Sequence, residues 1–220
     1  ARQRRGHELG QLGAVAVEGG LVRGELLGGG RVGRAARGGT PAPGRGVGVV
    51  LGHAPSVPVR RIEPGPGQES VWDYPRPPRL EPTTSHLVVR VAGVTVAETR
   101  RGHRVLETSQ PPAFYFPPED VDLALVRPSA HRTWCEWKGA ARYLDVVVGD
   151  RVVPEAAWAY DEPTPAFAAI AGHLAFYAQK ADECFVDGER VQANEGGFYG
   201  GWITSKVVGP FKGGPGTLGW

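Results

Sequence analysis

The heptapeptide Thr-Trp-Cys-Glu-Trp-Lys-Gly at residues 133–139 gathers side chains that are suited to binding or catalysis. Trp137 could stack against a flat ligand, Lys138 could hold a carboxylate or phosphate, and Glu136 could exchange a proton. Aromatic walls with a few convergent polar groups are typical of small-molecule sites. We therefore predict a ligand pocket that contains Glu136, Trp137 and Lys138 and is completed by Tyr143, Trp158 and Tyr160.

The same residues allow a purely structural interpretation. The tryptophans would then belong to the hydrophobic core, and the aliphatic stem of Lys138 would lie beside them with its ammonium in water. The sequence alone leaves both interpretations open.

A thiol-dependent redox reaction is the main catalytic alternative. Cys135 would attack the substrate and Cys184 would resolve the product, with Arg132 and Lys138 near in sequence to stabilise a thiolate. Free cysteine is also among the most buried residue types, so burial of both sulfurs is the competing interpretation. Two cysteines are too few for a disulfide scaffold and indicate a protein of the reducing cytoplasm.

Motifs for metals and cofactors are missing from the sequence. The two isolated cysteines and the scattered histidines do not have the paired spacing of a zinc site. Asp120 and Asp122 could hold magnesium for nucleotidyl transfer, but no Gly-rich phosphate loop precedes them. The serine-hydrolase motif Gly-x-Ser-x-Gly does not occur. We therefore predict neither a metal nor a cofactor.

Short extended segments separated by turns dominate the sequence after residue 58. Two dipeptides, Ala92-Gly93 and Asp187-Gly188, each separate two apolar runs and predict hairpins. The prolines of residues 62–82 disfavour helix and favour an extended chain. The expected strands span residues 86–91, 94–98, 104–107, 113–116, 142–148, 155–160, 184–186 and 190–191.

One segment has the spacing of a helix. Phe167, Ile170 and Leu174 recur at intervals of three and four residues, which predicts a single short helix over residues 165–171. Many strands and one short helix together predict a mainly β, antiparallel fold.

Residues 1–58 differ sharply in composition from the rest of the 220-residue chain. They contain 16 glycines and no aromatic residue, whereas all six Trp, six Tyr and seven Phe follow residue 58. Without large side chains to bury, and with so much glycine to order, this segment is predicted to be disordered. We therefore divide the chain into a disordered Gly/Arg-rich segment (1–58), a Pro-rich arm (59–82), and a β domain with an ordered aromatic C-terminal tail (83–220).

The charge divides at the same position. Residues 1–58 carry eight arginines and three glutamates, while the remainder carries 17 basic and 20 acidic residues, so the net charges are +5 and −3. This balance gives no support for specific nucleic-acid binding. No run approaches the roughly 20 apolar residues of a membrane span, so we expect no membrane partner. The sequence does not indicate an oligomeric state.

The sequence contains no methionine and changes character just before Val59. Because a valine codon, GUG, can serve as a bacterial start codon, we hypothesise that translation begins at or near Val59. Residues 1–58 would then be upstream sequence that the native protein lacks.

Several stretches of residues 59–220 resemble one bacterial family, the domain of unknown function 427, in the longer form common in actinobacteria. The resemblance rests on Gln68-Glu-Ser-Val-Trp-Asp-Tyr-Pro, Arg104-Val-Leu-Glu-Thr-Ser, Tyr115-Phe-Pro-Pro-Glu-Asp-Val, Cys135-Glu-Trp-Lys-Gly and Gly196-Gly-Phe-Tyr-Gly-Gly-Trp, among others. It implies an open, tent-like antiparallel β fold, and although the family is sometimes labelled nucleotidyltransferase-like, it implies no activity.

We therefore expect a soluble β domain that binds a small molecule. The alternatives are a redox enzyme that uses Cys135 and Cys184, and a protein-interaction module. Whether the protein is an enzyme is left open by the sequence.

Overall fold

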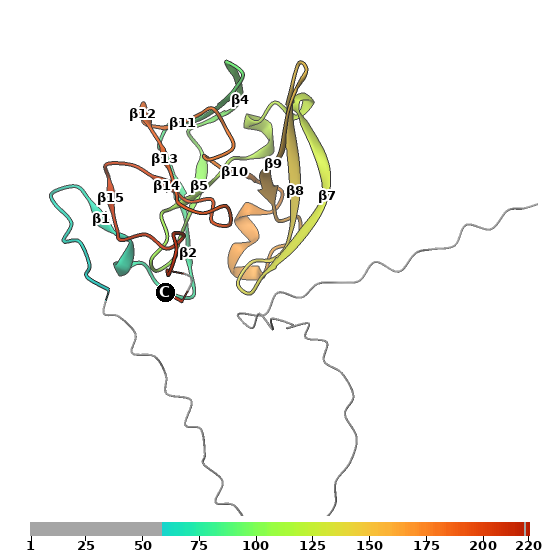
Figure 1. Cartoon of the computed structure of the whole chain (residues 1–220). Helices are drawn as coiled ribbons and strands as arrows, with labels where there is room; N and C mark the ends of the chain where they lie inside the picture. Colours follow the sequence, from blue (N-terminus) through green and yellow to red (C-terminus); the bar gives the residue numbers. More distant parts are fainter. Residues whose placement is uncertain (1–58, 218) are drawn as a thin grey trace, which may run out of the picture. The chain divides into compact units, whose positions relative to one another are not determined.

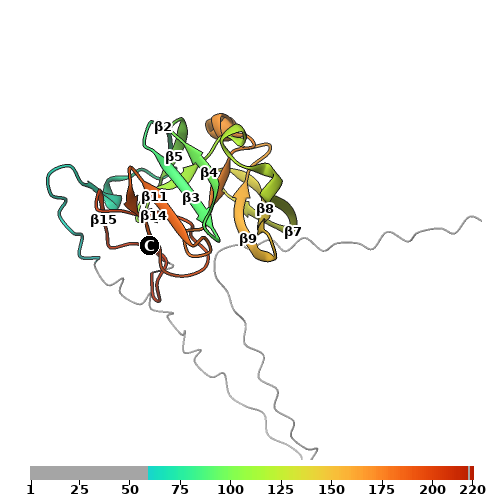
Figure 2. The same ribbon diagram turned by 90° about the horizontal axis from the view of Figure 1, so that it is seen from above.

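The computed structural model describes residues 59–217 and 219–220. The predicted disorder of residues 1–58, and the hypothesis that the native protein lacks them, lie outside the described residues. From Val59 onward the chain forms one unit of short strands joined by turns, in which strands β7 to β9 lie on one side and β1 and β15 on the other (Figures 1 and 2).

The largest hairpin belongs to a four-stranded sheet of order β10-β9-β8-β7. All its neighbours are antiparallel, and register shifts within the β7–β8 and β8–β9 pairs mark bulges, which bend strands. β7 is an edge strand that the sequence did not predict. The four strands are β7 (Val126–Cys135), β8 (Gly139–Val148), β9 (Arg151–Ala159) and β10 (Leu174–Phe176).

A second four-stranded sheet has the order β12-β11-β3-β4 and contains both predicted hairpins. Ala92 and Gly93 have φ values of 50° and 76°, and Asp187 and Gly188 have values of 53° and 84°. Two consecutive positive φ angles are the geometry of a two-residue hairpin turn, so both predictions are confirmed. The strands are β3 (Leu87–Val91), β4 (Val94–Thr99), β11 (Glu183–Val186) and β12 (Glu189–Arg190).

The third sheet has three strands in the order β2-β5-β6. Its register places Glu81 opposite Arg104 and Arg104 opposite Phe114. Because alternate residues of a strand point to opposite faces, these three residues share one face and their neighbours share the other. The strands are β2 (Arg79–Thr83), β5 (Gly102–Leu106) and β6 (Ala113–Tyr115).

Two small strand pairs connect the ends of the unit. β1 and β15 form the one parallel pair among the named strands, and β13 and β14 are antiparallel. The aromatic tail therefore contributes strands, and its Trp202 is only 1% exposed. The strands are β1 (Glu69–Ser70), β13 (Gln192–Ala193), β14 (Trp202–Ile203) and β15 (Val207–Val208).

Every helical segment in the described residues is a short 3-10 helix. The predicted helix at 165–171 is present as η4, but Leu174 lies in β10 instead of extending the helical face. Phe167 and Ile170 are the buried residues of η4, and their spacing of three matches the three residues per turn of a 3-10 helix. The segments are η1 (Val71–Asp73), η2 (Pro118–Asp120), η3 (Leu123–Leu125) and η4 (Pro165–Ile170).

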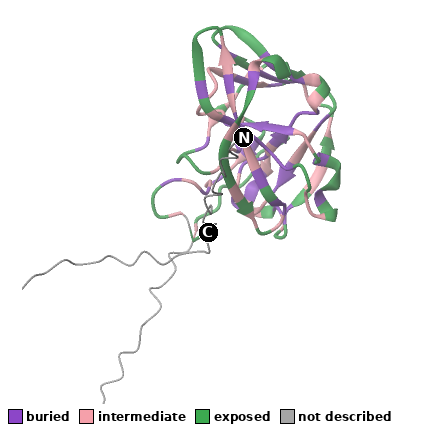
Figure 3. Cartoon of the chain, turned by 90° about the vertical axis from the view of Figure 1, so that its right-hand side faces the viewer, coloured by how far each residue is buried: buried purple, intermediate pink, exposed green. Residues whose placement is uncertain are grey.

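Buried, intermediate and exposed stretches are interspersed along the chain (Figure 3). The buried hydrophobic side chains form three clusters. The largest contains Phe114, Phe116 and Trp202 together with residues from both four-stranded sheets. The second contains Tyr115, Trp158 and Tyr160 and is called the aromatic cluster below. The fold is therefore mainly β with open sheets and short helical turns, as the sequence predicted.

Candidate functional site

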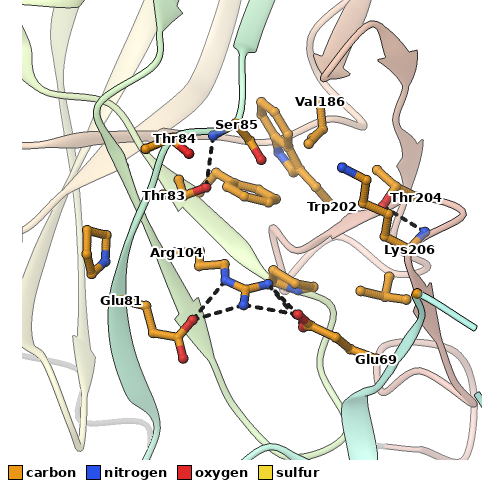
Figure 4. Close-up of a pocket in the computed structure, with 15 residues that line it drawn as sticks. Glu69, Glu81, Thr83, Thr84, Ser85, Arg104, Val186, Trp202, Thr204 and Lys206 are labelled. Carbon is orange, nitrogen blue, oxygen red and sulfur yellow. Dashed lines mark hydrogen bonds and ion pairs between the residues drawn. The ribbon is translucent and has the colours of Figure 1, made fainter.

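A pocket of about 340 Å³ opens between the β2-β5-β6 sheet and the segment that carries β14 and β15 (Figure 4). This volume lies near the lower end of the roughly 300–1,000 Å³ that is usual for ligand sites. We call it the charged pocket after the four charged residues that line it: Glu69, Glu81, Arg104 and Lys206.

Arg104 lies between two carboxylates on one side of the charged pocket (Figure 4). Its Nη1 lies 3.0 Å from Glu69 Oε2, and its Nε donates to Glu81 Oε2 at 3.0 Å. Arg79 Nε donates to the other oxygen of Glu81 at 2.6 Å, and the Tyr74 hydroxyl donates to Glu69 Oε2 at 2.6 Å. The charged groups thus form one hydrogen-bonded network that crosses three segments of the chain.

Strand alternation explains why this network faces the pocket. Glu81 and Arg104 are register partners in β2 and β5, so their side chains emerge on the same face. Glu69 belongs to β1, far away in sequence, and reaches Arg104 because β1 is held against β15. The site therefore depends on the tail as well as on the central sheet.

The network stabilises the charged form of Glu69. Partial burial acts to raise the pKa of Glu69, but hydrogen bonds from Arg104 and Tyr74 outweigh it and lower that pKa overall. Burial and the hydrogen bond to Glu69 raise the pKa of the Tyr74 phenol, which therefore remains a donor.

The rim of the pocket is tied together by Asp187, in the turn between β11 and β12. Its carboxylate accepts a hydrogen bond from His86 N at 2.8 Å and from Lys206 Nζ at 2.7 Å. The Lys206 ammonium, with help from the His86 amide, lowers the pKa of Asp187. Glu189 similarly binds the backbone amide and the hydroxyl of Ser205. These contacts tie β12 and the turn before it to the segment that leads into β15.

The deep wall of the charged pocket is apolar. Trp202 packs on Phe114 with ring centroids 5.4 Å apart, and its indole donates to Phe176 O at 2.9 Å. Hydroxyl groups line the remaining wall, supplied by Thr83, Thr84, Ser85 and Thr204.

This geometry is better suited to binding than to proton transfer. A general acid must hold a proton near neutral pH, which requires an environment that disfavours its charge. Glu69 and Glu81 are instead both paired with a guanidinium. The network therefore holds both carboxylates in fixed positions beside Arg104, and the pKa of Glu69 is lowered instead of raised.

The structure brings most of the predicted ligand residues together at the aromatic cluster, away from the charged pocket. Trp158 and Tyr160 are buried in the aromatic cluster, and Trp137 and Tyr143 pack against it partly buried. Glu136 is exposed in the turn between β7 and β8 and does not join them. None of these residues lines the charged pocket.

Lys138 is enclosed by this cluster and is only 8% exposed. Its Nζ lies 5.8 Å from the ring centre of Tyr160 and 5.6 Å from that of Phe167, distances typical of cation–π contacts. Burial acts to lower the pKa of Lys138, but Tyr115, Cys135 and Glu107 raise it overall. The structural interpretation is correct for Trp137, which packs against the cluster, but wrong for Trp134, which is 74% exposed. It is also wrong for the Lys138 ammonium, which stays inside instead of reaching water.

The two cysteines are both free and belong to different parts of the core. Cys184 is 3% exposed in the largest cluster, and burial raises the pKa of its thiol to about 12. Cys135 is partly exposed and packs against the aromatic cluster. A buried thiol with so high a pKa is poorly suited to resolve a product, so the redox alternative gains no support.

Sequence reasoning about single motifs missed the residues of the charged pocket. Glu69 and Arg104 both lie in stretches that carry the family resemblance, and that was the one signal that pointed to them. Glu81 gave none, because an isolated glutamate in a Pro-rich arm is indistinguishable from a solvated one.

Residues 79–187 match the model of a family described as Domain of unknown function (DUF427). The chain therefore contains a DUF427 domain. The match spans β2 to the turn after β11, which is narrower than the resemblance seen in the sequence, and it includes Glu81, Arg104 and the aromatic cluster. No curated protein matches the chain.

The described residues contain neither a membrane-spanning helix nor a metal-binding group of side chains. Across residues 59–217 and 219–220, none of the helices has the length and apolar character needed to cross a membrane. In the same residues, no group of three or more His, Cys, Asp or Glu side chains is arranged to hold a metal ion.

Proposed function

We propose that the DUF427 domain binds a small polar molecule in the charged pocket. The observation that carries this proposal is the Arg104 network, in which one guanidinium joins Glu69 and Glu81 at the edge of an open pocket. Charged groups that serve only stability need no pocket beside them. Here the side chains of Glu69, Glu81 and Arg104 hold one another in one orientation before a ligand binds, which lowers the entropic cost of binding.

The position of the pocket supports the same proposal. It is formed where three separate pieces of the chain meet, and its rim is preorganised by Asp187 and Glu189. Sites that discriminate between ligands generally rest on such rigid supports. The predicted ligand residues around Lys138 support binding less well, because the aromatic cluster is closed around the ammonium.

A thermal-shift screen of the full chain against a metabolite panel tests the proposal. A compound that binds the native state must raise the melting temperature, and the shift must increase with the concentration of the compound. Thr84 is exposed and lines the pocket, so the variant Thr84→Phe should fill the pocket with a larger side chain. Thr95→Phe, at an exposed position of β4 outside the lining, is the matched control.

We expect hits that shift the wild type and Thr95→Phe equally and leave Thr84→Phe unshifted. A panel with no hit at millimolar concentration, or hits that shift Thr84→Phe as much as the control, would refute binding in this pocket.

Protein interaction is a second candidate, and one observation favours it. Trp134 is 74% exposed on the edge strand β7. Trp is strongly enriched among the residues that dominate protein interfaces. If the domain is an interaction module, Trp134→Ala abolishes a self-association or pull-down partner that the wild type shows. Sedimentation of the wild type as a monomer, with no partner captured, would count against this function.

We further propose that the protein works in the cytoplasm. The two cysteines remain free in the structure, and unpaired thiols are usual in reducing compartments. Fractionation of the source cells with an antibody to the domain tests this directly, and recovery outside the cytoplasm would contradict it.

A further inference from the structure

The charges that line the charged pocket are already neutralised by one another. Arg104 pairs with Glu69 and Glu81 at 3.0 and 2.9 Å, and Lys206 pairs with Asp187 at 2.7 Å. The four charged lining residues, two acidic and two basic, thus carry no net charge. Every charged side chain of the lining therefore has an ion-pair partner of opposite charge.

This pairing works against a charged ligand. An anion would lose its hydration and then face Glu69 and Glu81, while an ammonium would face Arg104 and Lys206. Either ligand would have to displace an existing partner, and the partner left behind would carry an uncompensated charge. A phosphate group therefore gains little here, although two basic residues are present.

The other polar side chains of the lining are hydroxyls, and three of the four already have a hydrogen-bond partner. Thr83 Oγ1 accepts from Ser85 N, Thr204 Oγ1 accepts from Lys206 N, and the Ser85 side chain bonds to Asp187. Thr83, Thr84 and Ser85 form a continuous run on one wall, and Thr204 lies in the segment opposite. A hydroxyl both donates and accepts hydrogen bonds, so it matches another hydroxyl in either direction. Among the described residues, the side chain of Thr84 takes part in no hydrogen bond, and it is exposed, so it is free to bind.

The size of the pocket limits the ligand. A volume of about 340 Å³ admits one saturated ring more readily than a dinucleotide-sized molecule. The apolar residues behind the pocket, Phe114, Val186 and Trp202, are 6%, 5% and 1% exposed and offer a ligand almost no open surface.

Resting on the proposed binding function, we infer that the ligand is an uncharged polyhydroxylated ring, that is, a monosaccharide or a cyclic polyol. The wall hydroxyls, Thr84 above all, bind the hydroxyl groups of the ring. The ion-pair network remains intact and supplies a rigid polar edge.

Ligand-observed NMR titrations of the full chain test this inference with matched compounds. The neutral probes are glucose, galactose, mannose and myo-inositol. Glucose 6-phosphate is the anionic counterpart of glucose, and glucosamine is the cationic one. We expect at least one neutral probe to bind. Glucose 6-phosphate and glucosamine should bind about tenfold more weakly than the neutral probe that binds best.

Two variants locate the binding. Thr84→Val removes one hydroxyl while it keeps the size of the side chain, and we expect a loss of about threefold to tenfold in affinity, the effect of one hydrogen bond. Thr95→Val, exposed on β4, should leave the affinity unchanged.

The outcomes separate this inference from the function on which it rests. Tighter binding of a phosphorylated or amino sugar overturns the inference and leaves small-molecule binding standing. Hits from the metabolite screen without any neutral polyol do the same. Equal affinity in wild type and Thr84→Val shows that the sugar binds elsewhere and overturns the inference as well. Absence of any ligand in both experiments overturns the proposed function itself.

Discussion

Arg104 and Val105 are consecutive residues of β5, yet their side chains enter two very different environments. Arg104 faces the charged pocket, where carboxylates balance its charge. Val105 faces the aromatic cluster, where Lys138 is enclosed by rings and no carboxylate lies within ion-pair distance of it in the described part of the chain. One thin sheet therefore separates an open polar region from a closed apolar one.

The difference teaches which region can change without loss of the fold. Aromatic residues in the closed region bury large areas, and the backbone near Gly200 approaches the Trp158 ring so closely that a Cβ there would clash. The open region is built from paired charges in contact with water, which contribute less to stability. We therefore expect mutations in the aromatic cluster to affect folding and mutations in the charged pocket to affect binding.

The largest expected effect is that of Trp158→Ala. Removal of this buried ring should lower the free energy of unfolding by about 3–5 kcal/mol, because it leaves a cavity in the aromatic cluster. Urea denaturation of the full chain measures it. Trp134→Ala removes the same side chain from a site that is 74% exposed, and should cost no more than about 0.5 kcal/mol. Similar losses in both variants would remove the distinction between the regions.

A smaller loss is expected from Arg104→Met. The substitution leaves Glu69 and Glu81 facing each other without the shared guanidinium, and should lower stability by about 2 kcal/mol. The control is Arg79→Met, which removes a more exposed partner of Glu81 and should cost less than about 1 kcal/mol. If both variants are equally stable, the network does not hold the pocket in shape.

The pH dependence of stability gives a third comparison. Because the pKa of Glu69 is lowered below its ordinary value of 4.5, its carboxylate stabilises the fold above that pH. This contribution is lost as the pH falls through the lowered pKa. The free energy of unfolding of the wild type should therefore exceed that of Glu69→Gln by about 1 kcal/mol or less at pH 7. This difference should disappear as the pH falls below 4.5. A gap that widens on acidification would contradict the assignment.

The smallest effect is expected from Lys138→Met. Replacement of a buried charge by an apolar side chain of similar shape is often neutral, so stability should change by no more than about 1 kcal/mol. Ligand binding in the charged pocket should be unaffected. Loss of ligand binding at unchanged stability would instead support the ligand role first predicted for Lys138.

The sequence predicted the fold well wherever local chemistry determines it. The two hairpin turns were evident because Asp187-Gly188 is a dipeptide that adopts positive φ readily, and because Gly93 lies between two apolar runs. Strand β7 was missed because its residues are mostly exposed and include Pro128, so the alternation of apolar and polar residues was absent. The helix predicted at 165–171 is present at 165–170, but Leu174, which contributed to the predicted helical spacing, is buried as part of a strand.

The candidate site was predicted less well, for a physical reason. Proximity in sequence grouped Trp137 and Lys138, and the fold does gather their predicted aromatic neighbours. The Arg104 network, in contrast, is assembled from β1, β2 and β5, and it depends on the parallel pairing of β1 with β15. Such long-range pairing leaves no periodic pattern in a single sequence, and composition did not indicate which charged residues would face inward.

Asp187 serves two purposes with one side chain. Its left-handed backbone forms the turn between β11 and β12, while its carboxylate holds Lys206 at the rim. Asparagine tolerates the same backbone conformation but carries no charge. Exchange of one oxygen for nitrogen at this position would therefore keep the hairpin and release a cation into the mouth of the pocket. If the pocket binds a neutral ligand as proposed, this single substitution should shift its preference toward anions.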